Sequence, residues 1–422
     1  RNNRKNIKKG IKMKLFFHYK DRDITYENLI EDINKTEEIN KYIFEKDPYE
    51  ILKQLITSII NGNKIILLDS DFSKEELKNL EIIESELEKT YKNNNKVENI
   101  EDLFNKLEKN KDTWELTLYT SGTTGRPKKV RHNLESLTRG VKVSEKYKNN
   151  IWAFAYNPTH FAGLQVFFQA FYNKNPLIYV FDMDRKIIEE TLNRFQVTHI
   201  SATPTFYRSI IPYIKQQIPT VERLTMGGEK YDETLENILI KIFPNAEIRN
   251  VYASTEAGSI FSAKGDIFRI SERLRDKIKI NEDNELLIHK SLLGESETLK
   301  LDGEWYRTGD LVEKIDDDHF KFISRKTEMI NVGGYKVNPH EVENEIKKVE
   351  GVIDVLVKAR NNRITGSILT AEVEVMEGIN KKEKEKEIIK VLEKNLQNWK
   401  IPRIITFVDN IELTRTGKKV RK

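Results

Sequence analysis

The chain has 422 residues, enough for two or three domains with sizeable cores. It carries 72 Lys and Arg against 67 Asp and Glu, and this small net charge of +5 gives no strong signal for nucleic acid. Cysteine is absent, which excludes disulfides, thiolate metal sites and a Cys nucleophile. Because no apolar run has the length of a membrane span and no signal-like segment is present, we expect a soluble cytoplasmic protein.

Strand-like and helix-like segments alternate from about residue 50 to residue 255. The apolar run 64–68 predicts a buried strand, and 74–91 predicts a charged amphipathic helix capped by Ser73. The segments that follow predict, in chain order, a connection at 92–112 with a helix at 100–107, strand 114–119, a helix from 133, strand 152–156, a helix from 161, strand 177–181, helix 185–195, strand 198–201, a helix after 204, helix 232–243 and strand 247–252. This alternation predicts an α/β fold with layered, largely parallel sheets.

The pattern changes twice in the C-terminal part of the chain. Short strands and turns at 259–323 predict a small β-rich subdomain. Beyond residue 325 the predicted elements are helix 339–349, strands 354–359 and 367–375, helix 381–396 and strand 404–408. We therefore expect a large α/β domain at 1–325 and a small separate α+β domain at 326–422.

One loop, at 118–130, combines hydroxyls, glycines and lysines directly after an apolar run. Glycines let backbone N–H groups approach a phosphate, hydroxyls donate further hydrogen bonds, and lysine adds a mobile positive charge. The loop is not a Walker loop, because Arg126 and Pro127 follow Gly125 where Lys and Ser or Thr would be needed. The residues expected to bind phosphate are Thr120, Ser121, Gly122, Thr123, Thr124, Gly125 and Lys128.

Five further segments are rich in glycine and polar residues where simple packing would not require them. They are residues 226–229, 250–256, 306–311, 324–343 and 414–418. Together with the loop at 118–130, and in this order, they resemble the motifs of the adenylate-forming superfamily. That superfamily includes acyl- and aryl-CoA synthetases, nonribosomal peptide adenylation domains and luciferases. The resemblance runs from residue 114 to the C-terminus, and the region before it looks abbreviated.

The resemblance implies a two-step ligase reaction and a mobile C-terminal domain. A carboxylate first attacks the α-phosphate of ATP, giving an acyl-adenylate and pyrophosphate in the presence of Mg²⁺. A pantetheine thiol, from CoA or from a carrier protein, then attacks the acyl carbon and releases AMP. The first step is phosphoryl chemistry, in which positioning and charge stabilisation do most of the catalysis.

Residues of the 250–256 segment are expected at the nucleotide. By resemblance, Glu256 contacts Mg²⁺, a hard cation that prefers oxygen ligands, and Thr255 hydrogen-bonds the α-phosphate. Tyr252 is expected to stack on adenine, and Asn250 to reach its amino group. The same set is completed by Gly227, Gly228, Glu229 and Ala253. Ala253 stands where many relatives have glycine.

The C-terminal motifs imply ribose binding, a hinge and a catalytic lysine. Asp310 is expected to accept both ribose hydroxyls, since a carboxylate is an acceptor with two oxygens, and Arg325 to contact ribose or phosphate. Lys326 matches the hinge about which the small domain pivots. Lys418 matches the catalytic lysine, whose ammonium would offset charge as two anions approach.

The acid and its thiol acceptor are expected to meet near residue 160. The residues assigned to the acyl pocket and the thiol tunnel are His160, Phe161, Gly163, Thr203, Gly333 and Gly334. No acidic residue lies between residues 157 and 171, which disfavours an amino acid substrate and favours an apolar acyl or aryl acid. Two alternatives stay open: an amino-acid-adenylating ligase, and a non-catalytic nucleotide-binding protein of the same fold.

Overall fold

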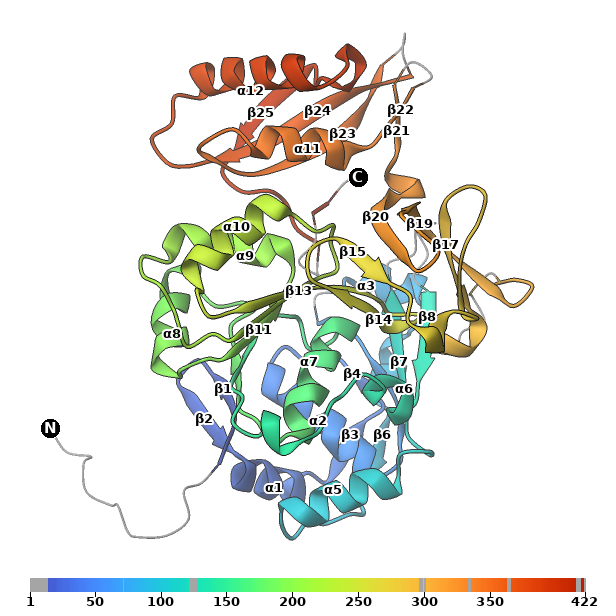
Figure 1. Ribbon diagram of the computed structural model, residues 1–422. Helices are drawn as coiled ribbons and strands as arrows, with labels where there is room; N and C mark the ends of the chain where they lie inside the picture. The colour runs from blue at the N-terminus through green and yellow to red at the C-terminus, as the bar shows by residue number, and fades with distance from the viewer. Residues whose placement is uncertain are drawn as a thin grey trace, which may run out of the picture.

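The largest element of the structure, a computed structural model, is an eight-stranded sheet. The described residues are 14–70, 72–120, 128–295, 299, 301–332, 335–362, 366–414 and 419–420. In spatial order the sheet consists of β14 (Gly258–Ala263), β13 (Glu247–Ser254), β12 (Arg223–Gly227), β11 (His199–Ala202), β9 (Trp152–Phe154), β10 (Leu177–Tyr179), β1 (Leu15–Tyr19) and β2 (Arg22–Thr25) (Figure 1). Pairing is parallel from β13 to β1 and antiparallel at both edges, as expected for a largely parallel α/β sheet.

A second, four-stranded sheet faces the first across a layer of helices. Its strands are β4 (Tyr42–Ile43), β5 (Lys64–Leu67), β7 (Glu115–Thr120) and β8 (Lys128–His132). The nearby helices are α1 (Tyr26–Lys35), α2 (Pro48–Ile60), α5 (Ile100–Lys109), α6 (Leu134–Thr138) and α7 (Phe161–Tyr172). One buried cluster joins the apolar faces of α2 and α7 to both sheets. Such a layer explains why α7 is apolar on nearly all sides, from Phe161 to Phe171.

The other face of the large sheet is covered by three helices, α8 (Ile188–Arg194), α9 (Pro204–Ile210) and α10 (Glu233–Ile242). They pack over the sheet through a separate buried cluster that includes Tyr207 and Phe243. A small two-stranded sheet, β3 (Glu38–Asn40) with β6 (Thr90–Lys92), lies near the N-terminal helices.

A β-rich subdomain follows the large sheet in the chain and has its own core. Its strands are β15 (Ile267–Arg269), β16 (Ile278–Ile280), β17 (Glu285–His289), β18 (Leu301–Asp302), β19 (Trp305–Lys314) and β20 (His319–Arg325). Phe261, Phe268 and Phe320 are buried at its centre, with ring centroids 5.0–6.1 Å apart. Strand β20 ends at Arg325, where the first predicted domain was expected to end.

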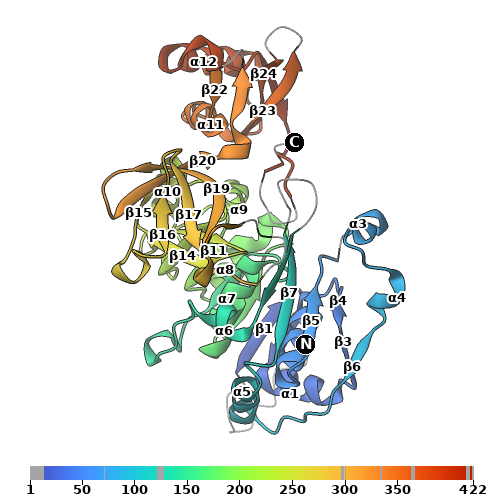
Figure 2. The same cartoon turned by 90° about the vertical axis from the view of Figure 1, so that its right-hand side faces the viewer.

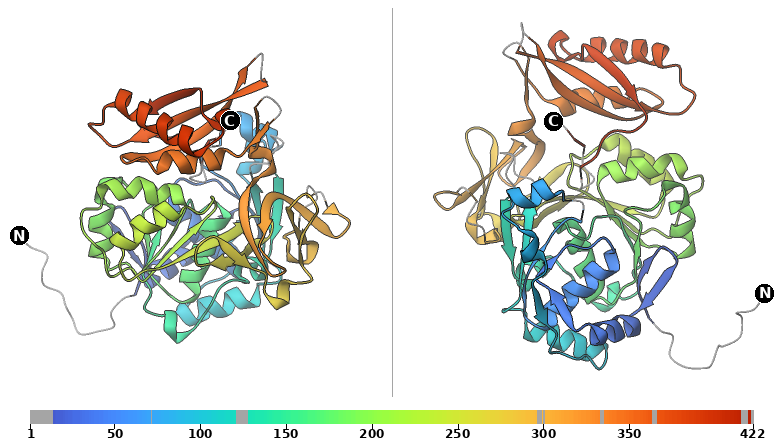
Figure 3. Two further views of the ribbon diagram at one scale, coloured as in Figure 1. Left: turned by 45° about the horizontal axis from the view of Figure 1, so that its top comes forward. Right: turned by 180° about the vertical axis from the view of Figure 1, so that it is seen from behind.

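The remaining residues form a small α+β domain at one end of the molecule, as Figures 1 and 2 show. A three-stranded sheet of β23 (Val352–Asn362), β24 (Gly366–Val375) and β25 (Ile404–Val408) carries helices α11 (Pro339–Lys347) and α12 (Lys381–Asn395). The hairpin of β21 (Ile330–Val332) and β22 (Tyr335–Val337) joins this core. Both views of Figure 3 show the domain on the side of α9 and α10.

The predicted fold class is confirmed, and one predicted helix is wrong. Residues 74–91 form α3 (Lys74–Asn79) and α4 (Glu84–Leu87), followed by β6. The break falls at Glu81, whose φ of +60° is left-handed, a conformation that ends a helix of L-residues. Among the described residues, no helix is long and apolar enough to cross a membrane.

Candidate active site

Parallel pairing brings the predicted motifs of the large domain to one edge of the sheet. Strands β9, β11, β12 and β13 all run in the same direction, so their carboxyl ends meet. Thr203 follows the end of β11, Gly227 ends β12, and His160 lies six residues beyond β9. Ligands of open α/β sheets bind outside this edge, so the topology alone places a site where four sequence segments converge.

The glycines at 227 and 228 are required by the backbone. A Cβ on Gly227 would lie 3.3 Å from the Val251 carbonyl oxygen, and Gly228 has a φ of +82° that disfavours other residues. The carboxylate of Glu229, directly after them, accepts a 2.8 Å hydrogen bond from the Thr205 hydroxyl. It also lies 3.8 Å from the Arg208 guanidinium. Glu229 is thus held by α9, and its side chain contacts the large domain rather than open solvent.

Tyr252, Asp310 and Arg325 form a polar triad that joins three strands. The Tyr252 hydroxyl donates to Asp310 Oδ2 at 2.5 Å, and Arg325 Nε lies 2.9 Å from Asp310 Oδ1. Asp310 and Arg325 are direct cross-strand partners on β19 and β20. The nearby Asp310 carboxylate raises the pKa of Arg325, and burial together with that carboxylate raises the pKa of Tyr252 well above its usual value. The raised pKa values keep the guanidinium charged and the phenol neutral beside the Asp310 carboxylate.

The end of β13 directs the next residues away from the ladder. Its register with β14 shifts between Tyr252 and Ala253, an irregularity of the kind that re-aims side chains beside active sites. Glu256 then follows in a turn, where its backbone carbonyl accepts from Gly294 N at 2.7 Å. Its side chain contacts the Tyr306 hydroxyl at 3.5 Å. Asn250 is buried and its amide donates to the Gly265 carbonyl at 3.1 Å, so its carbonyl oxygen is the group suited to an adenine amino group.

The predicted phosphate loop connects two paired strands of the four-stranded sheet. Thr120 ends β7, Lys128 begins β8, and the two residues are backbone partners across the hairpin. The residues between them, and the predicted thiol-tunnel and catalytic residues of the small domain, lie outside the described part of the chain: Ser121, Gly122, Thr123, Thr124, Gly125, Gly333, Gly334 and Lys418. Their assigned roles stay predictions.

Asp69 is a residue of the site that sequence reasoning missed. It follows β5, and it lies about 90 positions before the residues that it contacts. Its Oδ2 is 3.0 Å from His160 Nε2, and its Oδ1 accepts from Asn157 Nδ2 at 3.1 Å and from the Thr159 hydroxyl. The segment 157–171 contains no acidic residue, but the fold supplies one. Because the Asp69 oxygens already contact these three side chains, the carboxylate serves to orient His160.

The other residues predicted for the acyl pocket have packing roles that the structure defines. Gly163 lies in the first turn of α7, where a Cβ would be only 2.3 Å from the Asn157 carbonyl oxygen. Thr203 caps α9 by accepting from Phe206 N at 3.1 Å. The buried ring of Phe161 lies 3.5 Å from the position of a Cβ on Gly258. Phe161 therefore lies beside the residues that follow Glu256.

The predicted hinge residue, Lys326, comes directly after β20. Its Nζ lies 3.6 Å from Asp283 and 3.8 Å from Glu285, both in the β-rich subdomain. The side chain is half exposed, so these contacts are weak. The role of Lys326 as a hinge stays a prediction.

Family models match both domains of this chain. The model for AMP-binding enzymes matches residues 52–280, and the model for the C-terminal domain of AMP-binding enzymes matches residues 341–418. The chain belongs to the AMP-binding enzyme family. The resemblance predicted from the six motifs is thereby confirmed.

Characterised members of the AMP-binding enzyme family are similar over most of the chain. The 2-succinylbenzoate–CoA ligase of Listeria innocua is 25% identical over 335 residues, covering 72% of this chain and 69% of the ligase. Bacitracin synthase 3 of Bacillus licheniformis is 25% identical over 349 residues, covering 72% of this chain but only 5% of the synthase. The solved o-succinylbenzoate CoA synthetase of Bacillus subtilis, in complex with its acyl-adenylate, superposes with a TM-score of 0.70 at 17% identity, covering 97% of this chain and 94% of the synthetase.

Proposed function

We propose that this enzyme joins a carboxylic acid to the thiol of CoA in two steps driven by ATP. In the first, a carboxylate oxygen bonds to the α-phosphorus of ATP and pyrophosphate leaves. In the second, the thiol sulfur bonds to the acyl carbon, the acyl–phosphate bond breaks, and AMP leaves. The observation that carries the proposal is the convergence of Glu256, the Tyr252–Asp310–Arg325 triad and His160 with Asp69 around one sheet edge.

Each of these residues has chemistry that suits a part of the reaction. The Asp310 carboxylate accepts hydrogen bonds from the ribose hydroxyls, and Arg325 stays positively charged beside it. Tyr252 presents its ring to adenine. His160, held by Asp69, lies where the acid carboxylate approaches. Lys418 supplies positive charge between that carboxylate and the α-phosphate, so the two anions can meet.

Magnesium binding at this site depends on ATP. Among the described residues, no three His, Asp or Glu side chains group into a metal site of their own. Mg²⁺ commonly uses one or two protein carboxylates and completes its shell with substrate phosphates and waters. Glu256 fits that role because its carboxylate is partly exposed and, among the described residues, its side-chain hydrogen bond is the long 3.5 Å contact to the Tyr306 hydroxyl. We therefore assign Glu256 as the protein ligand of the Mg²⁺–ATP complex.

A pyrophosphate-release assay with a panel of acids tests this function. We expect pyrophosphate to form only when ATP, Mg²⁺ and the correct acid are present, and Lys418→Ala to abolish it. The same variant should still convert a supplied acyl-adenylate to the thioester, because the lysine acts only in the first step. ATP binding without pyrophosphate release for any acid would instead support a non-catalytic nucleotide-binding protein.

A cavity beside the proposed acyl site narrows the class of acid. Its volume is about 300 Å³, and its lining begins at Ala257 and Gly258, directly after Glu256. The cations of Arg139, Arg273 and Lys277 also line it, while no acidic residue is among the described residues that do so. The Cβ position of Gly258, which lines this cavity, is 3.5 Å from the Phe161 ring, so the cavity adjoins a residue assigned to the acyl pocket. We propose an acid with an apolar or aryl body and a second anionic group.

Matched acids that differ only by a second carboxylate test this specificity. We expect the diacid to have the higher kcat/KM, and Arg273→Gln with Lys277→Gln to reduce that preference without changing the KM for ATP. An equal response to both acids would refute the second anionic group and leave the ligase reaction intact. Selective activation of an amino acid would support the amino-acid-adenylating alternative. Supplying CoA and a phosphopantetheinylated carrier protein in parallel then identifies the acceptor.

A further inference from the structure

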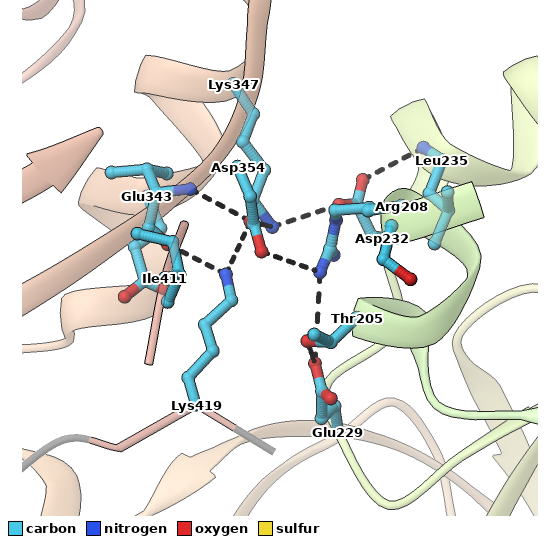
Figure 4. Close-up of polar contacts among 12 residues, drawn as sticks. Thr205, Arg208, Glu229, Asp232, Leu235, Glu343, Lys347, Asp354, Ile411 and Lys419 are labelled. Carbon is cyan, nitrogen blue, oxygen red and sulfur yellow. Dashed lines mark hydrogen bonds and ion pairs between the residues drawn. The ribbon is translucent and has the colours of Figure 1, made fainter. Parts of the chain in front are cut away.

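Six charged side chains meet where the small domain lies against the large one (Figure 4). Arg208 of α9, together with Glu229 and Asp232, comes from the large domain. Lys347 of α11, Asp354 of β23 and Lys419 come from the small domain. We refer to these six residues as the interdomain ion cluster. It contains three cations and three anions, and four of its side chains belong to neither the predicted motifs nor their immediate neighbours.

The contacts of the interdomain ion cluster cross the boundary in both directions. Lys347 Nζ lies 3.1 Å from Asp232 Oδ2, and Arg208 Nη1 lies 3.7 Å from Asp354 Oδ2. Within the large domain, Arg208 Nη2 donates to Asp232 Oδ2 at 2.7 Å. Within the small domain, Lys419 Nζ donates to Asp354 Oδ1 at 2.6 Å and to the Val355 carbonyl at 2.7 Å. Asp232 and Asp354 are thus each shared by cations of both domains.

These charged side chains are shielded from water, so each depends on its charged partners in this orientation of the domains. The side chains of Arg208, Asp232, Lys347, Asp354 and Lys419 are each at most 10% exposed. Burial opposes ionisation of Asp354, but the cations of Arg208, Lys419 and Lys347 outweigh it and hold its pKa below the usual value. A buried charge that loses its partner is strongly unfavourable. Turning the small domain would separate each shared carboxylate from one partner, and only hydration in the new orientation would offset that loss.

The interdomain ion cluster also connects two catalytic segments. Glu229, 3.8 Å from Arg208, follows the glycines assigned to the nucleotide. Lys419 is adjacent in sequence to Lys418, so the two Cα atoms are about 3.8 Å apart. We propose that the interdomain ion cluster holds the small domain in the orientation used for adenylate formation, and that Lys419 is a positioning residue for Lys418. The assignment to adenylate formation rests on the proposed function; the control of domain orientation does not.

Substitutions at the Lys347–Asp232 contact test the proposal, with urea denaturation to check that each variant folds. Lys347→Gln removes a cation that crosses the boundary, and Asp232→Asn keeps an acceptor for the α10 cap that Leu235 N now uses. The matched control is Lys348→Gln, since Lys348 is exposed and its ion-pair partner among the described residues is Glu345 of the preceding helix. Because the chain lacks cysteine, dye pairs on cysteines introduced at the exposed residues Lys241 and Glu393 report the domain orientation by energy transfer.

We expect both variants, but not the control, to shift the energy-transfer distribution and to slow adenylate formation about tenfold, the lower end for close charge pairs across interfaces. Thioester formation from a supplied acyl-adenylate should stay unchanged or become faster. Asp232→Asn also removes the charge that pairs with Arg208, so it should have the larger effect, and combining it with Lys347→Gln should cost less than the sum of the two single effects, since both disrupt the Lys347–Asp232 contact. An unchanged distribution in both variants would overturn the proposal. If no acid supports adenylation even in the unsubstituted enzyme, the proposed function fails while the energy-transfer result still decides the role of the cluster.

Lys419→Met tests the positioning role separately. We expect kcat for adenylation to fall with little change in the KM for ATP, and Lys419→Arg to restore part of it, because arginine retains the charge that pairs with Asp354. A loss in stability without any change in kcat would refute the positioning role.

Discussion

The Asp310→Asn substitution separates ribose binding from the structural role of the triad. Asp310 is only 3% exposed, accepts a hydrogen bond from Tyr252 and forms an ion pair with Arg325. Asparagine keeps one acceptor oxygen but replaces the other with a donor, so one hydrogen bond from a ribose hydroxyl to a charged group is lost. Such a bond contributes about 1.5–3 kcal/mol. We therefore expect kcat/KM for ATP to fall roughly 10- to 100-fold.

The effect of Asp310→Asn on stability should be smaller than its effect on ATP. The Arg325 side chain that pairs with Asp310 is 44% exposed, so its charge stays solvated when the carboxylate is removed. An ion pair of this kind contributes about 0–1 kcal/mol. Urea denaturation of the substituted protein should show a change of that size in the free energy of unfolding. Steady-state kinetics should show a change confined to ATP, with the KM for the acid preserved.

Tyr252→Phe is the matched comparison, because it keeps the aromatic ring and removes only the donor to Asp310. We expect a loss of about two- to tenfold in kcat/KM for ATP, the range of a single neutral hydrogen bond. Equal losses for ATP and for the acid in Asp310→Asn would contradict the assignment of Asp310 to ribose. So would a loss of unfolding free energy as large as the loss of transition-state stabilisation.

Three further predictions concern packing, orientation and pH. Gly163→Ala should lower the free energy of unfolding, measured by urea denaturation, by about 1–3 kcal/mol, because the added Cβ would meet the Asn157 carbonyl. The control, Gly140→Ala, should change it by less than about 0.5 kcal/mol, because the nearest neighbour of its Cβ is 3.7 Å away. Asp69→Asn should lower kcat/KM for the acid roughly tenfold and leave the KM for ATP unchanged, since His160 loses a charged partner; an equal loss for both substrates would contradict that role. Burial, with the nearby cations Lys347 and Arg208 and against the carboxylates Asp354 and Glu343, lowers the pKa of Lys419 from 10.5 to about 8. Between pH 8 and 10 the unfolded chain therefore binds more protons at this residue than the folded one, so the contribution of Lys419 to stability rises with pH. Across this window, the unfolding free energy of the unsubstituted protein should increase relative to that of Lys419→Met.

The sequence predicted the fold and most of the motif positions because both depend on local patterns. Alternating strands and helices indicated the parallel sheet, and short motifs such as 250–256 mark the carboxyl ends of its strands. The helix predicted at 74–91 failed because charge and periodicity continue through Glu81, while its left-handed backbone breaks the helix. Periodicity does not report where a chain must turn to bury Leu77 and Ile82.

Contacts between distant segments are what the sequence could not supply. Asp69 follows a strand of the second sheet, and no local feature links it to His160. The same holds for Arg208 and Asp354, which are 146 positions apart in a chain where charged residues make up 33%. In so charged a chain an individual charge gives no signal, and only burial distinguishes the few that are structural. A basic pair such as Lys418 and Lys419 is typical of an exposed tail until the structure places the second lysine against Asp354.

The contact between Lys419 and Asp354 bears on how Lys418, the lysine of the motif at 414–418, would be positioned. As the catalytic lysine that we propose, Lys418 would lose conformational entropy each time it entered the site, and a long side chain loses up to about 2 kcal/mol in rotamer freedom alone. Because Lys419 is held at Asp354, part of the backbone entropy cost of ordering the neighbouring Lys418 would already be met before ATP binds. Because the anchor, Asp354, also lies beside Arg208 of the large domain, the positioning that we propose for Lys418 would last only while the domains keep this orientation. In the proposed reaction, the charge that stabilises the orientation and the charge that acts on the substrates would be carried by neighbouring residues, so rotation of the small domain would also end the first step.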